Sequence, residues 1–237
     1  MQLFRRVLFF VCGLIYVTSV FGSETYRIPA EYVLFKESNQ AFEVVGQQVA
    51  TICVDPTDWK GVRRAVSDLS QDIFRVTGRK SDVVELDKVR KGSILVGTIG
   101  KSVLIDQLIR DGKLDVSTIK GQWESFLIQT IDDCLVIAGS DKRGTIYGIY
   151  DVSERIGVSP WYWWADVPVQ KRKEIYVKNG LYIQDSPKVK YRGIFINDEE
   201  PSFGGWARTK FGGINSKMYA HMFELLLRLK ANYLWPA

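Results

Sequence analysis

The sequence predicts an α/β fold, in which buried strands alternate with amphipathic helices that cross back over a sheet. Residues 50–54 form a short apolar run that ends in an Asp-Pro turn signal. Apolar side chains then recur at helical spacing over residues 58–76, until Gly78 supplies a helix stop. The apolar positions of this predicted helix are Val62, Ala65, Val66, Leu69, Ile73 and Val76.

The same alternation continues to about residue 180. The next predicted elements are a strand at 93–96, a helix to about residue 110, a hairpin formed by 124–130 and 134–138, and a helix at 143–155. Gly157 and Pro160 end the last helix. We therefore expect an N-terminal α/β domain, with a mixed sheet and helices, at residues 23–186.

A second unit begins near residue 187. It consists of a predicted strand at 191–196, a loop rich in glycine and acidic residues at 197–213, a helix at 216–230 and a strand at 232–235. The helix has an apolar face formed by Tyr219, Met222, Phe223, Leu226 and Leu229. A strand, a helix and a second strand make one repeat of a TIM (β/α)8 barrel, and a complete barrel needs about 200 residues or more. Residues 187–237 are expected to be the start of a truncated barrel.

The first 22 residues have the pattern of a secretory signal peptide. Arg5 and Arg6 precede an apolar run at 7–17, and Gly22 is a suitable last residue before cleavage. A membrane anchor is the alternative, but it needs roughly 20 apolar residues. The protein is therefore expected to be secreted or periplasmic.

Composition and charge limit the function classes. The 237 residues are 46% hydrophobic and 25% charged, which is an ordinary balance for a globular protein. The formal charge of +5 is spread along the chain, so no nucleic-acid partner is expected. His221 is the only histidine, which excludes a multi-histidine zinc site, and it is expected to be a structural or surface residue. No metal and no cofactor are expected.

Cys53 and Cys134 each lie inside an apolar, strand-like run. A disulfide is conceivable in an exported protein, but the surrounding pattern favours two buried thiols.

Residues 97–102, GTIGKS, follow a predicted strand and precede a predicted helix, as a phosphate-binding loop does. Such a loop requires a first glycine where this chain has Leu95, within the strand. The segment is therefore interpreted as a helix start.

Residues 161–164, WYWW, follow a turn. Three tryptophans in four residues cannot all be buried on one side of a strand. Packing against another domain is the favoured interpretation. The alternative is an aromatic platform for a sugar ring, with Trp164 as a substrate-binding candidate.

The acidic run Asn197-Asp198-Glu199-Glu200 follows directly on the predicted strand 191–196. In β/α barrels the carboxyl ends of the strands carry the chemistry. Three adjacent carboxylates repel one another, and glycoside cleavage uses one carboxyl group as an acid and another as a base or nucleophile. A solvated acidic turn or helix cap is an equally good local interpretation.

Three side chains downstream could contact a substrate. Trp206 could stack on a pyranose ring, and Arg208 and Lys210 could pair with a carboxylated sugar.

These segments resemble glycoside hydrolase family 115. The resemblance is carried by YRGIFINDEEP at 191–201, by KFGG at 210–213 and by LLRLKANYLWPA at 226–237. GSDKRGTIYG at 139–148 and the aromatic block at 161–168 resemble the N-terminal accessory domain of the same family. The family contains xylan α-1,2-glucuronidases, which remove glucuronic acid or its 4-O-methyl ether from xylan side chains.

The resemblance implies an inverting, metal-independent hydrolysis of glucuronoxylan by two carboxyl groups about 6.5–9.5 Å apart. By position, Asn197, Asp198 and Glu199 match the family's acidic loop, which implies that Asp198 or Glu199 serves catalysis or contacts the uronic acid. Asn197 and Glu200 are candidates for substrate contacts, and Glu200 is the weaker match. The remaining catalytic groups of such enzymes come from later barrel loops, so this chain alone is expected to be inactive. A homodimer of the full-length form is compatible with the resemblance.

Two other functions stay open at this point. One is another barrel glycosidase, such as a hexosaminidase-like enzyme, with a related accessory domain. The other is a non-catalytic module that binds carbohydrate or docks a domain, although the predicted helix and strand of the second unit would then leave apolar faces uncovered.

Overall fold

A mixed seven-stranded sheet organises the N-terminal unit. The computed structural model describes residues 24–85 and 89–236, so the predicted signal peptide at 1–22 lies outside the described residues. In spatial order the strands are β1 (Thr25–Arg27), β10 (Leu181–Gln184), β7 (Phe126–Ile131), β8 (Cys134–Gly139), β6 (Ile94–Thr98), β4 (Ile52–Val54) and β5 (Val83–Val84). Strands β8, β6, β4 and β5 are parallel, and β7 runs antiparallel to both β8 and β10. The predicted α/β class and mixed sheet are confirmed.

The predicted hairpin is strands β7 and β8. Its two-residue turn places Asp132 and Asp133 at φ 48° and 62°. A tight two-residue hairpin needs positive φ at both positions, and Asp tolerates that region better than most residues.

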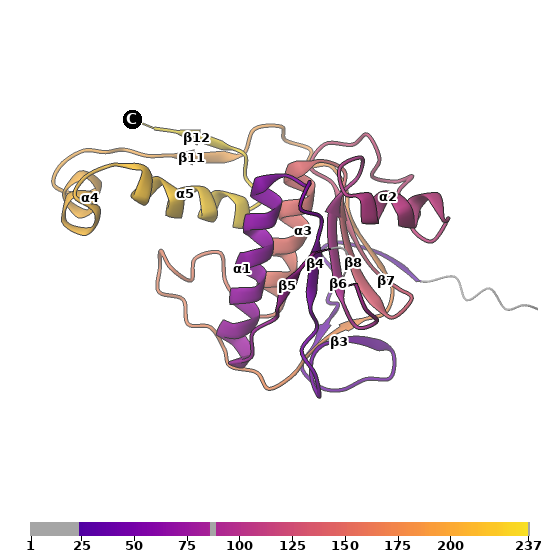
Figure 1. Ribbon diagram of the computed structural model, residues 1–237. Helices are drawn as coiled ribbons and strands as arrows, with labels where there is room; N and C mark the ends of the chain where they lie inside the picture. Colours follow the sequence, from indigo (N-terminus) through magenta and orange to yellow (C-terminus); the bar gives the residue numbers. More distant parts are fainter. Residues whose placement is uncertain (1–23, 86–88, 237) are drawn as a thin grey trace, which may run out of the picture.

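Helices cover both faces of the large sheet. Helices α1 (Lys60–Thr77) and α3 (Lys142–Arg155) pack together on one face, and α2 (Val103–Arg110) lies on the other (Figure 1). The apolar positions expected for α1 are all buried, and Gly78 ends the helix at φ 76°. The sheet therefore has a separate hydrophobic core on each side.

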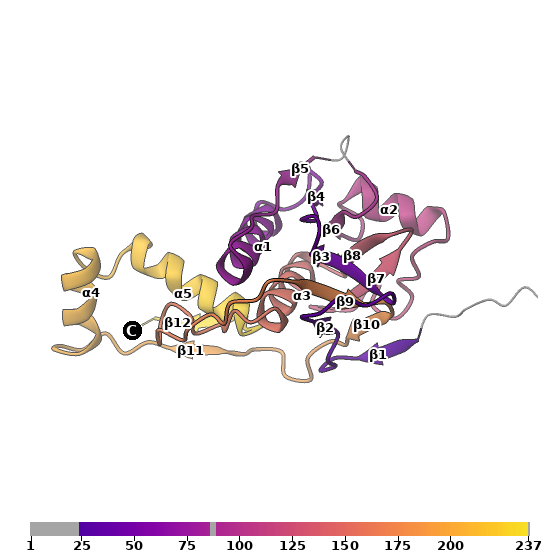
Figure 2. The same cartoon turned by 90° about the horizontal axis from the view of Figure 1, so that it is seen from below.

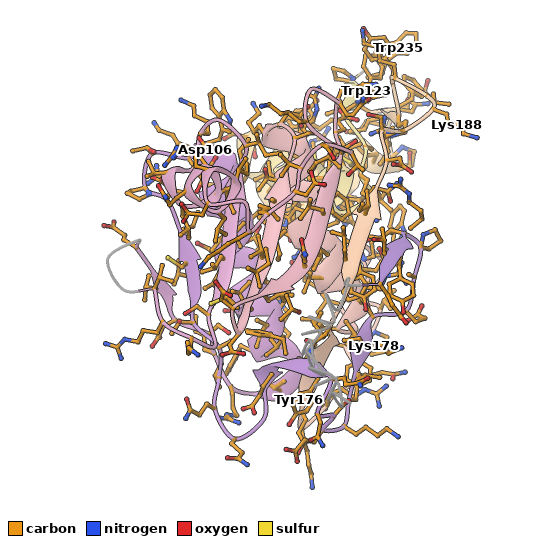
Figure 3. The ribbon with its side chains drawn as sticks, turned by 90° about the vertical axis from the view of Figure 1, so that its right-hand side faces the viewer. Asp106, Trp123, Tyr176, Lys178, Lys188 and Trp235 are labelled. Atoms are coloured by element: carbon orange, nitrogen blue, oxygen red, sulfur yellow. The ribbon has the colours of Figure 1, made fainter. Side chains whose placement is uncertain are left out.

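A second, three-stranded sheet was not predicted from the sequence. It consists of β2 (Val33–Leu34), β9 (Ile175–Lys178) and β3 (Ala41–Val45) in antiparallel pairing. Its inner side chains, including Val45 and Val177, join the core under α1 and α3. Figure 3 shows Tyr176 and Lys178 of this sheet at the opposite end of the molecule from Trp235.

The two cysteines of the described chain are buried thiols, as expected. The Cys53 thiol donates to the carbonyl oxygen of Glu85 at 3.4 Å, and the Cys134 thiol donates to that of Arg90 at 3.5 Å. They form no disulfide with each other.

The second unit contains β11 (Gly193–Phe195), α4 (Phe203–Phe211), α5 (Ser216–Arg228) and β12 (Tyr233–Trp235). The two strands pair in parallel, with Gly193 opposite Tyr233. A Cβ atom added at Gly193 would lie 1.9 Å from the carbonyl oxygen of Tyr233, so only glycine allows this approach. A strand, helices and a parallel strand are what a barrel repeat requires, while the complete barrel stays a prediction.

Two details of this unit differ from the expectation. The predicted loop at 197–213 contains helix α4, which the glycines at 204 and 205 concealed because glycine disfavours helix interiors. The buried face of α5 is also rotated: Met218, Met222, Leu225 and Leu226 are buried, whereas Phe223 and Leu229 are exposed. The predicted face was therefore right for Met222 and Leu226 and wrong for Phe223 and Leu229, because the face that packs is set by contact with α3 and not by hydropathy alone.

The second unit projects from the side of the first that carries α1 and α3 (Figures 1 and 2). Helix α5 packs against α3, and α4 lies at the far end of the projection. Within the described part of the chain, no helix has the length and apolar character needed to cross a membrane.

Candidate active site

The acidic loop, residues 197–200, lies at the carboxyl end of β11, as predicted. The backbone N–H of Ile196 donates to the carbonyl oxygen of Trp235 at 2.9 Å and extends the strand pairing up to the loop. Asn197, Asp198, Glu199 and Glu200 are all exposed. A substrate can therefore reach each of the three carboxylates.

Within the loop the side chains divide into two groups. The side-chain oxygen of Asn197 accepts from the backbone N–H of Glu199 at 3.2 Å, and Glu200 forms an ion pair with Arg208. The carboxylates of Asp198 and Glu199 form no ion pair with any other described residue. Asn197 and Glu200 thus shape the loop, while Asp198 and Glu199 keep both carboxylates available for a ligand.

Helix α4 begins against the acidic loop. The backbone N–H of Gly204 lies 3.4 Å from the carbonyl oxygen of Glu199, and Ser202 Oγ donates to the same oxygen at 3.1 Å. A Cβ atom added at Gly204 would lie 2.6 Å from the carbonyl oxygen of Asp198. The loop therefore needs glycine at this position.

We expect Gly204→Ala to displace the acidic loop and to lower the free energy of unfolding by about 1–3 kcal/mol, the usual cost of overpacking. Gly205→Ala is the matched control, because its added Cβ atom would meet only the flexible end of the Glu200 side chain, at 3.1 Å. Urea unfolding followed by circular dichroism measures both. Equal stability of the two variants would contradict this close contact.

An aromatic cluster beside the loop joins the two units. It consists of Trp163, Trp164, Trp206, Phe211 and His221. The Trp163 ring stacks on His221 with centroids 3.9 Å apart, and Trp206 lies 5.4 Å from Trp164 and 5.6 Å from Phe211. The Trp164 indole donates to the carbonyl oxygen of His221 at 3.2 Å. Trp163 and Trp164 thus pack between the units, which was the favoured interpretation for the 161–164 block, and both are partly buried, whereas Trp161 is exposed.

Lys210 brings a positive charge to this cluster. Its ammonium group lies 4.7 Å from the centroid of Trp163 and 5.8 Å from that of Trp206, within the range of cation–π attraction. Burial lowers the pKa of His221, which favours a neutral ring in the stack. Of the predicted site residues, Trp164, Trp206 and Lys210 gather in one cluster, and Arg208 is held by Glu200 at its edge.

Glu124, which the sequence analysis missed, connects the two units. Its buried carboxylate accepts from Arg143 Nε at 2.6 Å, from Asn232 Nδ2 at 2.8 Å and from Arg192. Arg192 and Asn232 flank β11 and β12, so Glu124 holds the start of both strands on the first unit. In the sequence, Glu124 is visible only as a carboxylate next to a strand that is expected to be buried. The sequence does not show which distant residues would contact it.

A second buried charge network holds α5 on α1. Arg228 donates to Asp72 at 2.8 and 3.3 Å and to Glu224 at 2.9 Å. The guanidinium group also lies over the rings of Tyr150 and Tyr162, at 4.6 and 4.9 Å. Asp72 and Arg228 occupy core-facing positions of their helices. Because charged residues are rarely buried without a partner, a charge on the apolar face of a helix was the one sequence feature that could have predicted this pair.

The Glu124 contacts predict how stability depends on pH. Burial alone would raise the pKa of Glu124, but hydrogen bonds from Asn232, Arg192 and Arg143 hold this pKa below its ordinary value. A carboxylate with a depressed pKa stabilises the fold above its unfolded-state pKa, and that stability is lost as pH falls through the folded-state pKa.

Glu124→Gln is therefore expected to lower the free energy of unfolding by about 2 kcal/mol at pH 7. The difference from the wild type should shrink below about pH 4.3, where the carboxyl of the unfolded chain begins to take up a proton, and it should shrink further as the pH falls through the depressed folded-state pKa. Urea unfolding at pH 7 and pH 3.5 measures it. A difference that is the same at both pH values would show that the ionised carboxylate is not what stabilises the contact.

Three comparisons relate the chain to known proteins. Residues 184–237 match the model of "Glycosyl hydrolase family 115". The solved structure of a family GH115 4-O-methyl-α-glucuronidase with specificity for decorated arabinogalactans is 37% identical, with a TM-score of 0.73. The match covers 83% of this chain and 26% of that one, so the chain spans about a quarter of its length. Among curated proteins, no sequence matches.

A more distant likeness concerns the fold alone. A Streptomyces plicatus β-hexosaminidase is 16% identical with a TM-score of 0.50, over 84% of this chain and 32% of that one.

Proposed function

We infer that the chain belongs to glycoside hydrolase family 115 and forms the N-terminal portion of a secreted α-glucuronidase. Two findings support this: the family match spans the acidic loop, α4, α5 and β12, and a 37% identical relative is a 4-O-methyl-α-glucuronidase. Export follows from the signal-peptide pattern of residues 1–22. The chain supplies the accessory domain and the first strand–helix repeat of the catalytic barrel, and further barrel repeats supply the rest of the enzyme.

The proposal rests mainly on the exposure of the Asp198 and Glu199 carboxylates and on their lack of an ion-pair partner among the described residues. Both carboxylates are exposed at the carboxyl end of β11 and form no ion pair within the described chain. In an inverting glycosidase one carboxylic acid protonates the leaving oxygen, and a second carboxylate activates a water molecule on the opposite side of the sugar. Asp198 or Glu199 fills one of these roles, and a carboxyl group on a later barrel loop fills the other.

The aromatic cluster and Lys210 bind the uronic acid. Trp206 and Trp164 present apolar ring faces to the sugar, and the Lys210 ammonium group, held over two indole rings, pairs with the sugar carboxylate. Asn197 and Glu200 contact the substrate from the loop, and Arg208 positions Glu200 through their ion pair.

Glucuronoxylan is the proposed substrate. Arabinogalactan is a second candidate, because the 37% identical relative is specific for decorated arabinogalactans. Both polymers carry the same terminal group, glucuronic acid or its 4-O-methyl ether, so the acidic loop and Lys210 serve either one. A hexosaminidase-like activity is not favoured, since the similarity to such an enzyme is 16% and concerns the fold alone.

The test is a substrate panel for the protein expressed from the reading frame extended beyond codon 237. We expect release of uronic acid from glucuronoxylan, measured by anion-exchange chromatography, and none of N-acetylglucosamine from chitin oligosaccharides. Release from arabinogalactan but not from xylan would select the second candidate. A stop codon after Ala237, or no uronic acid from either polymer, would refute the proposal.

A further inference from the structure

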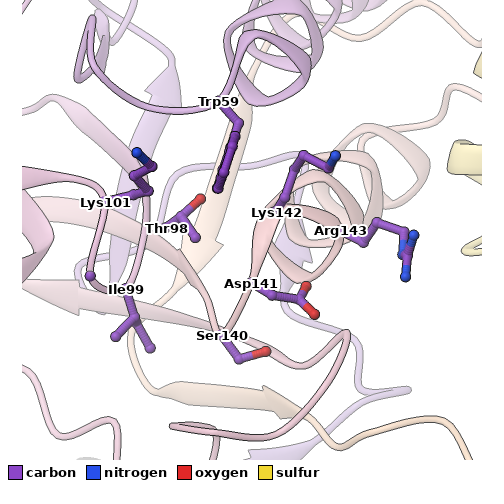
Figure 4. Close-up of a pocket in the computed structure, with 9 residues that line it drawn as sticks. Trp59, Thr98, Ile99, Lys101, Ser140, Asp141, Lys142 and Arg143 are labelled. Carbon is purple, nitrogen blue, oxygen red and sulfur yellow. The ribbon is translucent and has the colours of Figure 1, made fainter.

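A cavity of about 540 Å³ lies at the carboxyl ends of β4, β6 and β8, away from the acidic loop. It is lined by Trp59, by residues 98–101 at and after the end of β6, and by residues 140–143, where β8 leads into α3 (Figure 4). Its volume falls within the range of small-molecule sites, about 300–1,000 Å³. No residue of the acidic loop or of the aromatic cluster contributes to it.

The topology of the sheet favours a ligand at this position. Strand β6 leads into α2 on one face of the sheet, and its parallel neighbour β8 leads into α3 on the other face. The two connections diverge and leave a crevice outside the strand ends. In open α/β sheets, ligands bind at such switch points.

The charges around the cavity favour an anion. The ammonium groups of Lys101 and Lys142 lie 4.8 and 5.6 Å from the centroid of the Trp59 ring. Neither forms an ion pair with another described residue. Asp141 also lines the cavity, but its two carboxylate oxygens accept from the backbone N–H groups of Gly144 and Glu124, at 2.7 and 3.0 Å. Arg143 is paired with Glu124, so the other formal charges of the lining are the two ammonium groups and the single carboxylate of Asp141, and their sum is positive.

Trp59 gives the cavity an apolar wall. Trp59 directly precedes helix α1, and its side chain is 43% exposed. Figure 4 shows its indole between Lys101 and Lys142. A flat aromatic ring flanked by two cations matches a ligand that combines an apolar ring face with a carboxylate.

We propose that this cavity binds a uronic acid residue of a polysaccharide, as an ancillary site separate from the acidic loop. The sugar carboxylate pairs with one of the two ammonium groups, Lys101 or Lys142, which lie on opposite sides of the indole. The sugar ring packs on the face of the Trp59 indole beside that group. The choice of a uronic acid rests on the proposed function. Binding here requires no hydrolysis and none of the acidic-loop residues.

The test is a ¹H–¹⁵N NMR titration of the protein with methyl glucuronoside. Methyl glucoside is the matched probe, because it has the same ring and a hydroxymethyl group in place of the carboxylate. We expect glucuronoside-dependent shifts at the Trp59 indole N–H and at the amides of 98–102 and 140–143. Lys101→Ala/Lys142→Ala should weaken this binding at least about ten-fold, since it removes the charge-assisted contact on either side of the indole. Trp59→Ala should weaken it as well.

Two control variants test whether the effect is specific to this cavity and independent of the acidic loop. Lys36→Ala/Lys120→Ala removes the same charge from two other exposed positions and should leave the affinity unchanged. Asp198→Ala/Glu199→Ala should keep these shifts, so a failure of the proposed hydrolysis does not affect the titration. Unchanged affinity in Lys101→Ala/Lys142→Ala, equal binding of the glucoside, or shifts confined to residues 197–210 would overturn the inference. Equivalent shifts with inorganic phosphate alone would show an unspecific anion site and overturn it too.

Discussion

Asp198→Ala and Glu199→Ala should each lower the kcat for uronic acid release, and the variant that lacks the general acid or base should lose about 10²–10⁴-fold. The physical reason is that proton transfer in the transition state needs a carboxyl group at the substrate, and these two carboxylates are exposed at the end of β11 without a cation partner in the described chain. Initial rates with glucuronoxylan, measured on the protein expressed from the reading frame extended beyond codon 237, give the change in kcat. The variant that loses kcat with little change in KM identifies the catalytic group, and a raised KM identifies a binding group.

Glu37→Ala is the matched control, because it removes an exposed carboxylate from the connection between β2 and β3, outside the second unit. It should retain the wild-type rate. Wild-type rates in both Asp198→Ala and Glu199→Ala would remove these residues from the active site. The acidic loop would then be the solvated turn that its sequence equally allowed.

Asp72→Ala should destabilise the protein by about 3 kcal/mol or more, which corresponds to a decrease in Tm of roughly 6–12 °C for a chain of this length. Asp72 is completely buried and Arg228 is 2% exposed, so removal of the carboxylate leaves a buried guanidinium group with only Glu224 as its ion-pair partner among the described residues. Breaking such a pair costs more than the pair contributes, because the remaining charge stays out of water. Differential scanning calorimetry measures the change.

The control for this prediction is Asp185→Ala. Its ion pair with Arg27 has the same geometry, 2.8 Å between nitrogen and oxygen, but the two side chains are 62% and 54% exposed. An exposed pair contributes about 1 kcal/mol or less, so Asp185→Ala should change Tm little. Similar changes in both variants would contradict the importance assigned to burial.

Local patterns were sufficient to predict helix α1 and the parallel strands β4, β6 and β8 of the first unit, but not its three-stranded sheet. Helix α1 has a regular apolar face and a glycine at its end, and strands β4, β6 and β8 are short buried runs. These features depend only on neighbouring residues, and the predicted elements form because tertiary packing stabilises the same conformation that the local sequence prefers. Helix α4 was missed for the opposite reason: its glycines disfavour a helix locally, and contacts of Trp206 with Trp164 and Phe211 stabilise it.

The acidic loop was predictable in position, but its contacts with the rest of the chain were not. The acidic loop could be placed at a strand end because β11 precedes it directly. The contact between Lys210 and Trp163 joins residues that are remote in sequence, as do the pair of Asp72 with Arg228 and the cluster around Glu124. Composition and periodicity carry no information on such pairs, since they describe one segment at a time.

The most direct measurement is ¹H NMR of the uronic acid first released from an α-linked glucuronoxylan oligosaccharide by the enzyme that contains this chain. We predict that the β-anomer appears first and that the α-anomer follows only by mutarotation, because the proposed inverting mechanism reverses the configuration at the anomeric carbon. The Asp198→Ala/Glu199→Ala variant should release no detectable uronic acid on the same time scale. Initial release of the α-anomer would contradict inversion, and release by the double variant at the wild-type rate would contradict a catalytic acidic loop.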